Sequence, residues 1–179
     1  DFERVRKLIY AHAGISLSPI KQDMVYSRLA RRLRATGKSS FAAYLDALER
    51  DGGEEWERFV NSLTTNLTSF FREPHHFPIF ADHLKQLGTR RPIRVWCSAA
   101  STGEEPYSIA ITILETFGSQ VSHVSIFASD LDTNVLETAR KGVYPVERVE
   151  KMDPERLRRF FLRGTGSQEG MVAVRPELK

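Results

Sequence analysis

Apolar side chains recur at helical spacing through residues 1–63, and this pattern predicts four helices. They are expected over Phe2–Ala13, from Ser18-Pro19 to Gly37, from Ser39 or Ser40 through Leu48, and over Glu54–Leu63. Glycines follow the first two helices and the third precedes a Gly52-Gly53 break, which favours these limits. The chain is therefore predicted to begin with a small all-helical domain over 1–63.

The second predicted helix has one apolar and one basic face. Val25, Leu29 and Leu33 recur every fourth residue on the apolar face. The remaining arc carries four arginines, namely Arg28, Arg31, Arg32 and Arg34. Such an arc can contact phosphates or carboxylates, or it can be only a solvated face. It has no interleaved aromatic residues, which disfavours base stacking.

Residues 64–90 connect the helical domain to the next region. Small hydrogen-bonding side chains at 64–69 are followed by Phe70, Phe71 and Arg72, and Pro74 suits the first turn of a helix that ends at Gly88. The guanidinium of Arg72 could hold a ligand carboxylate, or it could be an ordinary surface group. The segment is predicted to be a linker followed by a connecting helix.

Residues 91–179 alternate between strand and helix patterns. Strands are predicted at Ile93–Cys97 and Val121–Ala128, each followed by a helix, at Glu104–Phe117 and Thr133–Lys141. This βαβα order predicts a parallel sheet in an α/β domain. A helix at Asp153–Phe160 then precedes two short strands around a glycine-rich turn, which predicts an antiparallel hairpin near 160–176.

The loop after the first predicted strand is a candidate ligand site. Ligands of such sheets collect at the carboxyl ends of the strands, and the small residues from Ala99 onward would let a ligand approach the backbone. The motif G-x-G-x-x-G is absent, which disfavours a nicotinamide dinucleotide. Asp130 ends the second strand, where a carboxylate can accept hydrogen bonds from a ribose diol, so a nucleoside ligand is favoured.

These same residues allow simpler interpretations. The loop could be only a tight connection, with Asp130 capping the next helix. Glu104 and Glu105 fall in a first helical turn, where the helix dipole alone favours acidic residues. They could equally bind a cationic group such as an α-amino or sulfonium centre. Spacing leaves these alternatives open.

Composition narrows the class of protein. With 179 residues, 41% hydrophobic and 27% charged, the chain is expected to be globular, neither disordered nor inserted in a membrane. The net charge of only +3 disfavours nucleic acid as a partner. The single cysteine, Cys97, excludes an internal disulfide, and the five histidines lack metal-ligand spacing, so no metal site is expected. A cytoplasmic location is expected, and the start at Asp1 indicates part of a longer protein.

Three stretches carry long, ordered motifs: TTNLTSFFRE at 64–73, VWCSAASTGEEPYS at 95–108 and ASDLD at 128–132. Together with the arginine-rich helix and RGTG at 163–166, they resemble the CheR family of chemotaxis receptor methyltransferases from end to end. The resemblance implies an α/β fold, in which a helical receptor-recognition domain (1–63) precedes a Rossmann-like class I methyltransferase domain. It places a linker that contributes to the cofactor site at 64–90, and the first part of the methyltransferase domain, with a small antiparallel β-subdomain, at 91–179.

The resemblance also implies a function. Family members use S-adenosylmethionine (SAM) to methylate specific glutamate side chains on the cytoplasmic helical bundle of chemoreceptors, leaving S-adenosylhomocysteine (SAH). By motif matching, the cofactor-binding residues are Asn66, Thr68, Arg72, Ala99, Glu105 and Asp130. Within this set, Asp130 would take the ribose hydroxyls. Arg72 would lie near the transferred methyl group and is the implied catalytic residue.

Partner surfaces follow from the same resemblance. Receptor binding is implied for Arg28, Arg31, Arg32 and Arg34, and binding of a receptor tail peptide for Arg163, Gly164, Gly166 and Gly170. A regulatory adaptor is a further candidate partner, and a monomer is expected. An asparagine-containing strand end that closes the family's cofactor site has no counterpart here, so the site is expected to be incomplete. Two alternatives stay open: a non-catalytic docking module and a nucleic-acid methyltransferase.

Overall fold

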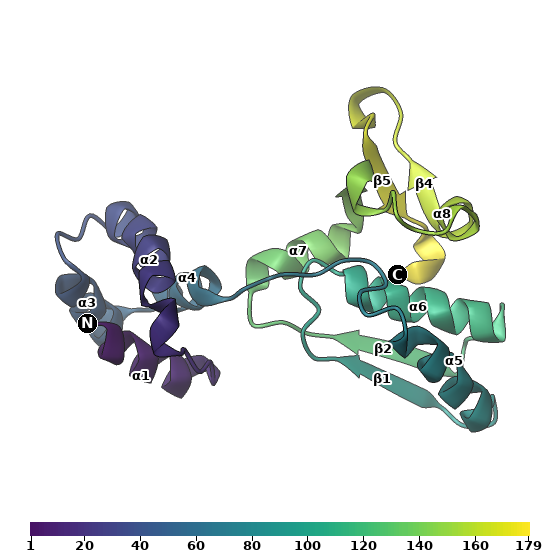
Figure 1. The fold of residues 1–179 in the computed structure, drawn as a ribbon, viewed down its shortest axis with the longest axis horizontal. Coiled ribbons are helices and arrows are strands. Elements are labelled where there is room, and N and C mark those ends of the chain that lie inside the picture. The colour runs from purple at the N-terminus through teal and green to yellow at the C-terminus, as the bar shows by residue number, and fades with distance from the viewer. The chain divides into compact units, whose positions relative to one another are not determined.

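The computed structural model describes residues 1–179, and the chain divides into two compact units. The first contains Asp1–Thr65 together with Leu131–Thr133. The second contains Asn66–Asp130 and Asn134–Lys179. Figure 1 shows helices in the first unit and both sheets in the second. None of the helices is long and apolar enough to cross a membrane.

The first unit is built from four helices around one apolar core. They are α1 (Phe2–Ala13), α2 (Gln22–Thr36), α3 (Phe41–Asp51) and α4 (Glu54–Leu63). Their buried side chains include Val5, Ile9, Val25, Leu29, Leu45 and Phe59. The four predicted helices are confirmed, with two differences in their bounds: the third continues past Leu48 to Asp51, and the second starts later than predicted. Ser18-Pro19 opens a short 3₁₀ turn over Pro19–Lys21, and the α-helix begins only at Gln22.

A shared carboxylate ties three of these helices together. Arg32 of α2 donates from Nε to Glu55 Oε1 at 2.9 Å and from Nη2 to Glu55 Oε2 at 2.6 Å. The hydroxyl of Tyr44 on α3 donates to Glu55 Oε1 at 2.9 Å. Burial by itself would raise the pKa of Glu55, but the hydrogen bonds from Arg32 and Tyr44 outweigh burial and lower that pKa below 4.5. The carboxylate is therefore charged in the folded protein at neutral pH.

The second unit holds a helix α5 (His76–Leu87) and a parallel sheet. Strand β1 (Ile93–Cys97) leads through α6 (Glu104–Phe117) to β2 (Val124–Ala128), and α7 (Thr133–Lys141) follows. The strands pair in parallel from Ile93↔Val124 to Cys97↔Ala128, as predicted. Strand β2 starts at Val124, three residues later than predicted. The backbone N–H of Val124 donates to the carbonyl of Val121 at 2.9 Å, so residues 121–124 form a turn before the strand.

A second, antiparallel sheet contains the predicted hairpin and one strand more. Its order is β3 (Val143–Pro145), β5 (Met171–Val174), β4 (Phe161–Arg163), and α8 (Pro154–Phe160) precedes β4. The hairpin pairing of β4 with β5 confirms the prediction, whereas β3 was not predicted. We call residues 143–174 the β-subdomain. Its Tyr144, Phe160 and Phe161 share an apolar core with Tyr107 and Ile111 of α6, so it is packed firmly on that helix.

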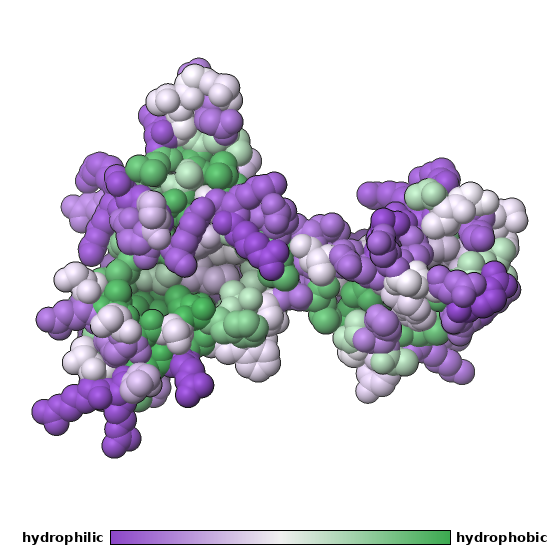
Figure 2. Space-filling model, turned by 180° about the vertical axis from the view of Figure 1, so that it is seen from behind, coloured by the Kyte–Doolittle hydropathy of each residue, from purple (hydrophilic) through white to green (hydrophobic).

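The two faces of the parallel sheet differ. Val95 and Ile126 are half-buried, whereas Trp96 and Phe127, which pair across the strands, keep 69% and 66% of their surface exposed on the other face. Figure 2 shows apolar residues at the surface of this unit between bands of hydrophilic ones. Alternation along each strand produces this difference, because successive side chains point to opposite faces.

Replacing Glu55 by glutamine should destabilise the helical unit. The change removes the charge that pairs with Arg32, and we expect a loss of about 1–2 kcal/mol in unfolding free energy, less than for a fully buried pair. Glu54→Gln is the matched control, because Glu54 is exposed and its pair with Arg58 should contribute less than about 0.5 kcal/mol. Urea unfolding at pH 7 measures both.

The loss of stability in Glu55→Gln should be smaller at acidic pH than at neutral pH. Because the pKa of Glu55 is lower in the folded state, its contribution is present above about pH 4.5 and is lost as pH falls through the folded-state pKa. The difference between wild type and Glu55→Gln should therefore shrink on acidification. A difference that stays constant from pH 7 to pH 3 would contradict this assignment.

Candidate functional site

The parallel pairing of β1 and β2 brings their carboxyl ends together. Past the strands, the backbone N–H of Ser129 donates to the carbonyl of Cys97, and that of Ala100 donates to the carbonyl of Ser129, both at 2.9 Å. The backbone N–H of Ser101 then donates to Asp130 Oδ2 at 2.8 Å. The loop after β1 and the acidic residue after β2 thus form one hydrogen-bonded edge.

Asp130 lies three positions before the first residue of helix α7. Helix α7 begins at Thr133, so the residue directly before it is Asp132, which is buried. Asp130 lies two residues earlier, half-buried at the strand end, with its carboxylate bonded to the loop of β1. Asp130 therefore lies at the edge of the sheet, next to the loop of β1. A half-buried carboxylate there suits a ribose.

The loop 98–103 has a backbone that only certain residues allow. Ser101 has φ +47° and Gly103 has φ +101°. A Cβ on Gly103 would lie 2.7 Å from the hydroxyl oxygen of Tyr144 and 2.9 Å from Ala139 Cα, so no side chain fits there. Gly103 therefore lets the loop pass close to the β-subdomain and α7 on its way into α6.

The two glutamates at the start of α6 have different surroundings. Glu104 is completely buried, accepts from Thr102 Oγ1 at 2.5 Å and pairs with Arg148 of the β-subdomain. Glu105 is exposed and lies beside Cys97, whose thiol is 3.6 Å from Glu105 Oε1. Burial and the neighbouring Glu105 raise the pKa of the Cys97 thiol to about 11, so it stays protonated. Glu104 therefore supports the loop, and Glu105 can meet a cationic ligand group.

Segment 66–72 is held against α6 and the β-subdomain. The backbone N–H of Phe71 donates to Ser108 Oγ on α6 at 2.9 Å. The ring of Phe70 packs edge-on against Tyr144 and Phe161, with centroids 5.1 and 5.3 Å away. The guanidinium of Arg156 lies 4.2 Å from the centroid of the Phe71 ring. These contacts stabilise an unusual backbone, in which Phe71 has φ +51°.

The predicted residues of this segment lie near its surface. Arg72 is exposed, and its Nη1 donates to the carbonyl of Leu67 at 3.1 Å. Asn66 is exposed and Thr68 is half-buried. Ala99, in the loop after β1, is exposed as well. Arg72 thus presents a positive charge from a segment whose backbone is fixed by its aromatic neighbours.

The four arginines of α2 do not form one solvated arc. Arg28 Nη1 donates to the carbonyl of Thr64 at 2.5 Å, and Arg32 is paired with Glu55. Both are half-buried, whereas Arg31 and Arg34 are exposed. Of the four arginines expected at the receptor surface, Arg28 and Arg32 thus also hold the helical unit together, and Arg31 and Arg34 face solvent.

Glycines shape the turn of the β-subdomain. A Cβ on Gly164 would lie 2.0 Å from the carbonyl oxygen of Gln168, so a side chain there is excluded. Gly166 and Gly170 have φ +59° and +81°, which favour glycine. Arg163 is exposed at the end of β4, which is an edge strand. The glycine pattern is thus explained by the turn itself.

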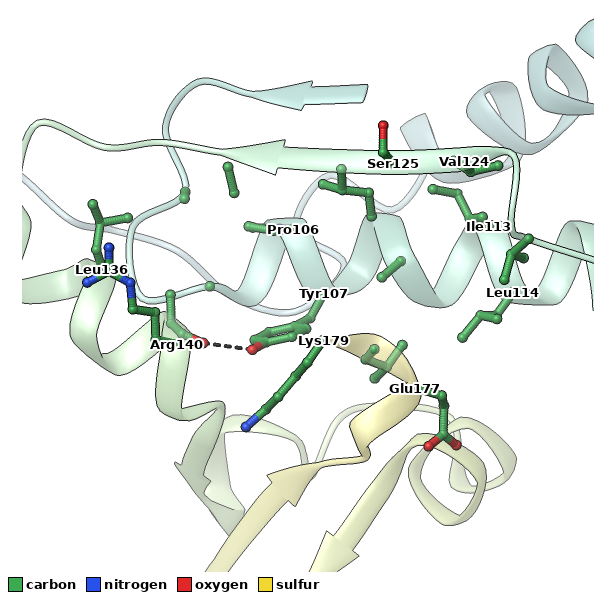
Figure 3. Close-up of a pocket in the computed structure, with 18 residues that line it drawn as sticks. Pro106, Tyr107, Ile113, Leu114, Val124, Ser125, Leu136, Arg140, Glu177 and Lys179 are labelled. Carbon is green, nitrogen blue, oxygen red and sulfur yellow. Dashed lines mark hydrogen bonds between the residues drawn. The ribbon is translucent and has the colours of Figure 1, made fainter. Parts of the chain in front are cut away.

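The same unit contains a groove. It has a volume of about 650 Å³ and is lined mostly by apolar residues of α6, β2 and α7, by Ala100 and Gly103 of the loop after β1, and by residues 177–179 (Figure 3). None of the predicted site residues lines it. Tyr107 lies at this groove and donates its hydroxyl to the carbonyl of Ala139 at 2.7 Å. Because Ala100 and Gly103 belong to the loop after β1, the groove borders the sheet edge with Asp130.

Sequence reasoning missed the residues that support the site from outside the motifs. Tyr144, Arg148 and Arg156 all come from the β-subdomain. Ser108, in the second turn of α6, ends the motif at 95–108, but its contact with Phe71 was not predicted. Each is an unremarkable residue type in its local context. Their partners lie 37–44 positions away for the contacts of Ser108, Tyr144 and Arg148, so no local pattern could have indicated them.

Comparison with known families agrees with this architecture. Residues 1–64 match the all-alpha domain of CheR methyltransferases, and residues 66–179 match their SAM-binding domain. The chain belongs to the CheR methyltransferase family. The CheR fold accounts for both units, the helical one and the one with a parallel and a small antiparallel sheet.

Individual CheR relatives match along nearly the whole chain. The chain is 53% identical over 178 residues to the chemotaxis protein methyltransferase of Escherichia coli (strain K12), covering 99% of this chain and 62% of the relative. It is 56% identical over 180 residues to chemotaxis protein methyltransferase 2 of Pseudomonas aeruginosa, covering 100% and 64%. For chemotaxis protein methyltransferase 2 of Vibrio cholerae, identity is 33% over 186 residues, with 100% and 65% covered. The chain thus spans less than two thirds of each relative.

Proposed function

We propose that the protein carrying this chain uses S-adenosylmethionine to methylate glutamate side chains of chemoreceptors, forming glutamyl methyl esters. The observation that carries this proposal is the edge at which the loop after β1 bonds to Asp130, in a domain that matches the SAM-binding domain of CheR. The printed names of the relatives, chemotaxis protein methyltransferases, support the reaction and the process.

The residues at this edge fit the chemical groups of the cofactor. Asp130 offers a carboxylate at a strand end, where ribose hydroxyls are commonly bound. Glu105 is an exposed carboxylate beside the loop, and it suits the amino group of the methionine part. Ala99 leaves room for close approach. Asn66, Thr68 and Arg72 are proposed to complete the chain's share of the site, with SAH as the bound product.

Bound SAM would supply a methyl group attached to a sulfonium sulfur. In the transfer, a bond would form between the methyl carbon and a carboxylate oxygen while the carbon–sulfur bond breaks and leaves a neutral thioether. A glutamate side chain is already ionised at pH 7, so no residue of the chain has to remove a proton. The chain's contribution is to place the two reactants. Arg72 would orient a carboxylate beside the transferred methyl, from a segment fixed by Ser108 and the aromatic contacts of Phe70 and Phe71.

Two surfaces of the chain suit a chemoreceptor as substrate. Arg31 and Arg34 leave α2 toward solvent and would meet an acidic bundle of receptor helices on the cytoplasmic side. The edge strand β4 with Arg163, together with the turn of Gly164, Gly166 and Gly170, would take a receptor tail peptide by strand addition.

Transfer of a labelled methyl group tests the proposed function. The complete protein is incubated with methyl-labelled SAM and a cytoplasmic fragment of a chemoreceptor, and the product is then treated with alkali. Alkali hydrolyses carboxyl methyl esters, so we expect label on the receptor to be released as volatile methanol. Label that resists alkali, or that appears on nucleic acid instead, would refute glutamate methylation.

Arg72 should be needed for transfer but not for the fold. We expect Arg72→Ala to lower kcat/KM about 100-fold, because misplacing the reactants costs that much. Arg91→Ala is a matched control in the same unit, since Arg91 is also exposed and lies outside the proposed site. Circular dichroism checks that both variants fold. Normal turnover of Arg72→Ala would remove Arg72 from the catalytic role.

The exposed arginines of α2 should affect binding of the receptor and not binding of the cofactor. Charge reversal at Arg31 and Arg34 should raise the KM for the receptor fragment about tenfold, with a steeper loss at low salt. Affinity for SAH, measured by calorimetry, should stay unchanged. Arg32→Glu is the informative contrast, because it breaks the pair with Glu55 and should lower the melting temperature as well. An unchanged receptor KM in the double reversal would show that this face is only solvated.

A further inference from the structure

The β-subdomain supports the loop after β1 through one hydroxyl group. The hydroxyl of Tyr144 on β3 donates to the carbonyl of Thr102 at 2.7 Å. Tyr144 keeps only 2% of its surface exposed, and burial raises the pKa of its phenol, so the group is a hydrogen-bond donor at every pH of interest. This hydroxyl oxygen would lie only 2.7 Å from a Cβ on Gly103, which shows how closely the loop approaches Tyr144.

A second contact from the β-subdomain supports Glu104, the first residue of α6 after the loop. Arg148 pairs with Glu104, which is fully buried at the start of α6. Thr102 Oγ1 donates to the same carboxylate at 2.5 Å. A buried carboxylate without its cation is strongly unfavourable, so Arg148 allows Glu104 to stay in this position. Thr102 is thus bound through its backbone carbonyl to Tyr144 and through its side chain to Glu104.

The ring of Tyr144 also contacts the other half of the proposed site. Phe70 packs edge-on against this ring, with centroids 5.1 Å apart. Phe70 lies two positions before Arg72, and the next backbone N–H, that of Phe71, is fixed on Ser108. One side chain therefore touches both segments that carry proposed cofactor residues: its hydroxyl touches the loop, and its ring touches Phe70.

The loop needs such support because its backbone is strained. Ser101 has φ +47°, a backbone conformation that is unfavourable for residues other than glycine. Without outside contacts the loop would sample other conformations, and ligand binding would have to restrict it again. A loop that is already held in the binding conformation loses less conformational entropy when the ligand binds.

We infer that Tyr144 is a positioning residue, whose hydroxyl holds the loop Ser101–Glu104 in the conformation that binds the nucleoside part of the cofactor. The inference rests on the proposed function and adds a role for the β-subdomain in cofactor affinity. Tyr144 itself does not touch the cofactor in this assignment. It acts through the carbonyl of Thr102, and Arg148 acts in the same direction through Glu104.

Tyr144→Phe tests the hydroxyl while it keeps the ring that contacts Phe70. Tyr107→Phe is the matched control: Tyr107 also donates its hydroxyl to a backbone carbonyl at 2.7 Å, but to Ala139 of α7 rather than to the loop (Figure 3). Both variants lose one comparable hydrogen bond, so their melting temperatures should fall by similar amounts. A general loss of stability is thereby separated from an effect on the loop.

The first readout needs no cofactor. Hydrogen exchange in the unliganded, complete protein measures opening of the loop through the amides of Ser101 and Gly103, which are bonded to Asp130 and to the carbonyl of Ala100. We expect these two amides to exchange about fivefold faster in Tyr144→Phe, the effect of losing one hydrogen bond. They should exchange as in wild type in Tyr107→Phe.

The second readout is affinity for SAH, measured by calorimetry. We expect a dissociation constant about fivefold higher in Tyr144→Phe and unchanged in Tyr107→Phe. In the methyl-transfer assay the KM for SAM should rise by the same factor, whereas kcat should change little because the ring still supports Phe70. Should Tyr144→Phe fail to fold, Arg148→Gln takes its place with the same expected direction.

The outcomes separate the two proposals. Wild-type protein that binds no SAH contradicts the proposed function, and the exchange measurement still tests the loop. Wild-type protein that binds SAH, with Tyr144→Phe equal to it in both affinity and exchange, overturns the positioning role. Equal losses in Tyr144→Phe and Tyr107→Phe would also overturn it, since both would then reflect stability alone.

Discussion

The parallel pairing of β1 with β2 is the constraint on which the candidate site depends. A register from Ile93↔Val124 to Cys97↔Ala128 ends both strands at one level. The backbone bonds between Cys97, Ser129 and Ala100 continue that register past the strands, and they bring Ser101 within 2.8 Å of Asp130. A shift of one residue would turn Asp130 to the other face of the sheet, because side chains alternate along a strand. The site therefore depends on the ladder as much as on its own side chains.

The β-subdomain belongs to the same structural unit as the parallel sheet. It shares an apolar core with α6, and its polar groups reach the loop 98–103 through Tyr144 and Arg148. Two residues with positive φ, Phe71 and Ser101, lie beside these contacts. Strained backbone persists only where surrounding contacts determine it, and here hydrogen bonds and aromatic packing supply them. The β-subdomain, which is proposed to bind a receptor peptide, thus also contacts the loop that is proposed to bind the cofactor.

In the helical unit, charge serves two purposes on one helix. Arg28 and Arg32 of α2 are bound to Thr64 and Glu55 and stabilise the packing of the helices. Arg31 and Arg34 are exposed and are the ones available to a partner. Arg34 is three positions after Arg31, which places the two side chains near each other on the helix surface. Two arginines of α2 therefore stabilise the helical unit, and the other two form its candidate interface.

The sequence alone predicted most helices and strands from the spacing of apolar residues and from glycines and serines at their ends. Such patterns are local properties of a sequence. The motifs at 64–73, 95–108 and 128–132 likewise indicated the CheR family and the candidate residues Arg72, Glu105 and Asp130. Strand β3 escaped prediction because three residues ending in proline form a strand only when β5 lies beside them. Only the tertiary structure separated buried Glu104 from exposed Glu105, and Arg32 from Arg31. Burial and ion pairing depend on residues tens of positions away, and no local pattern records which of them will meet.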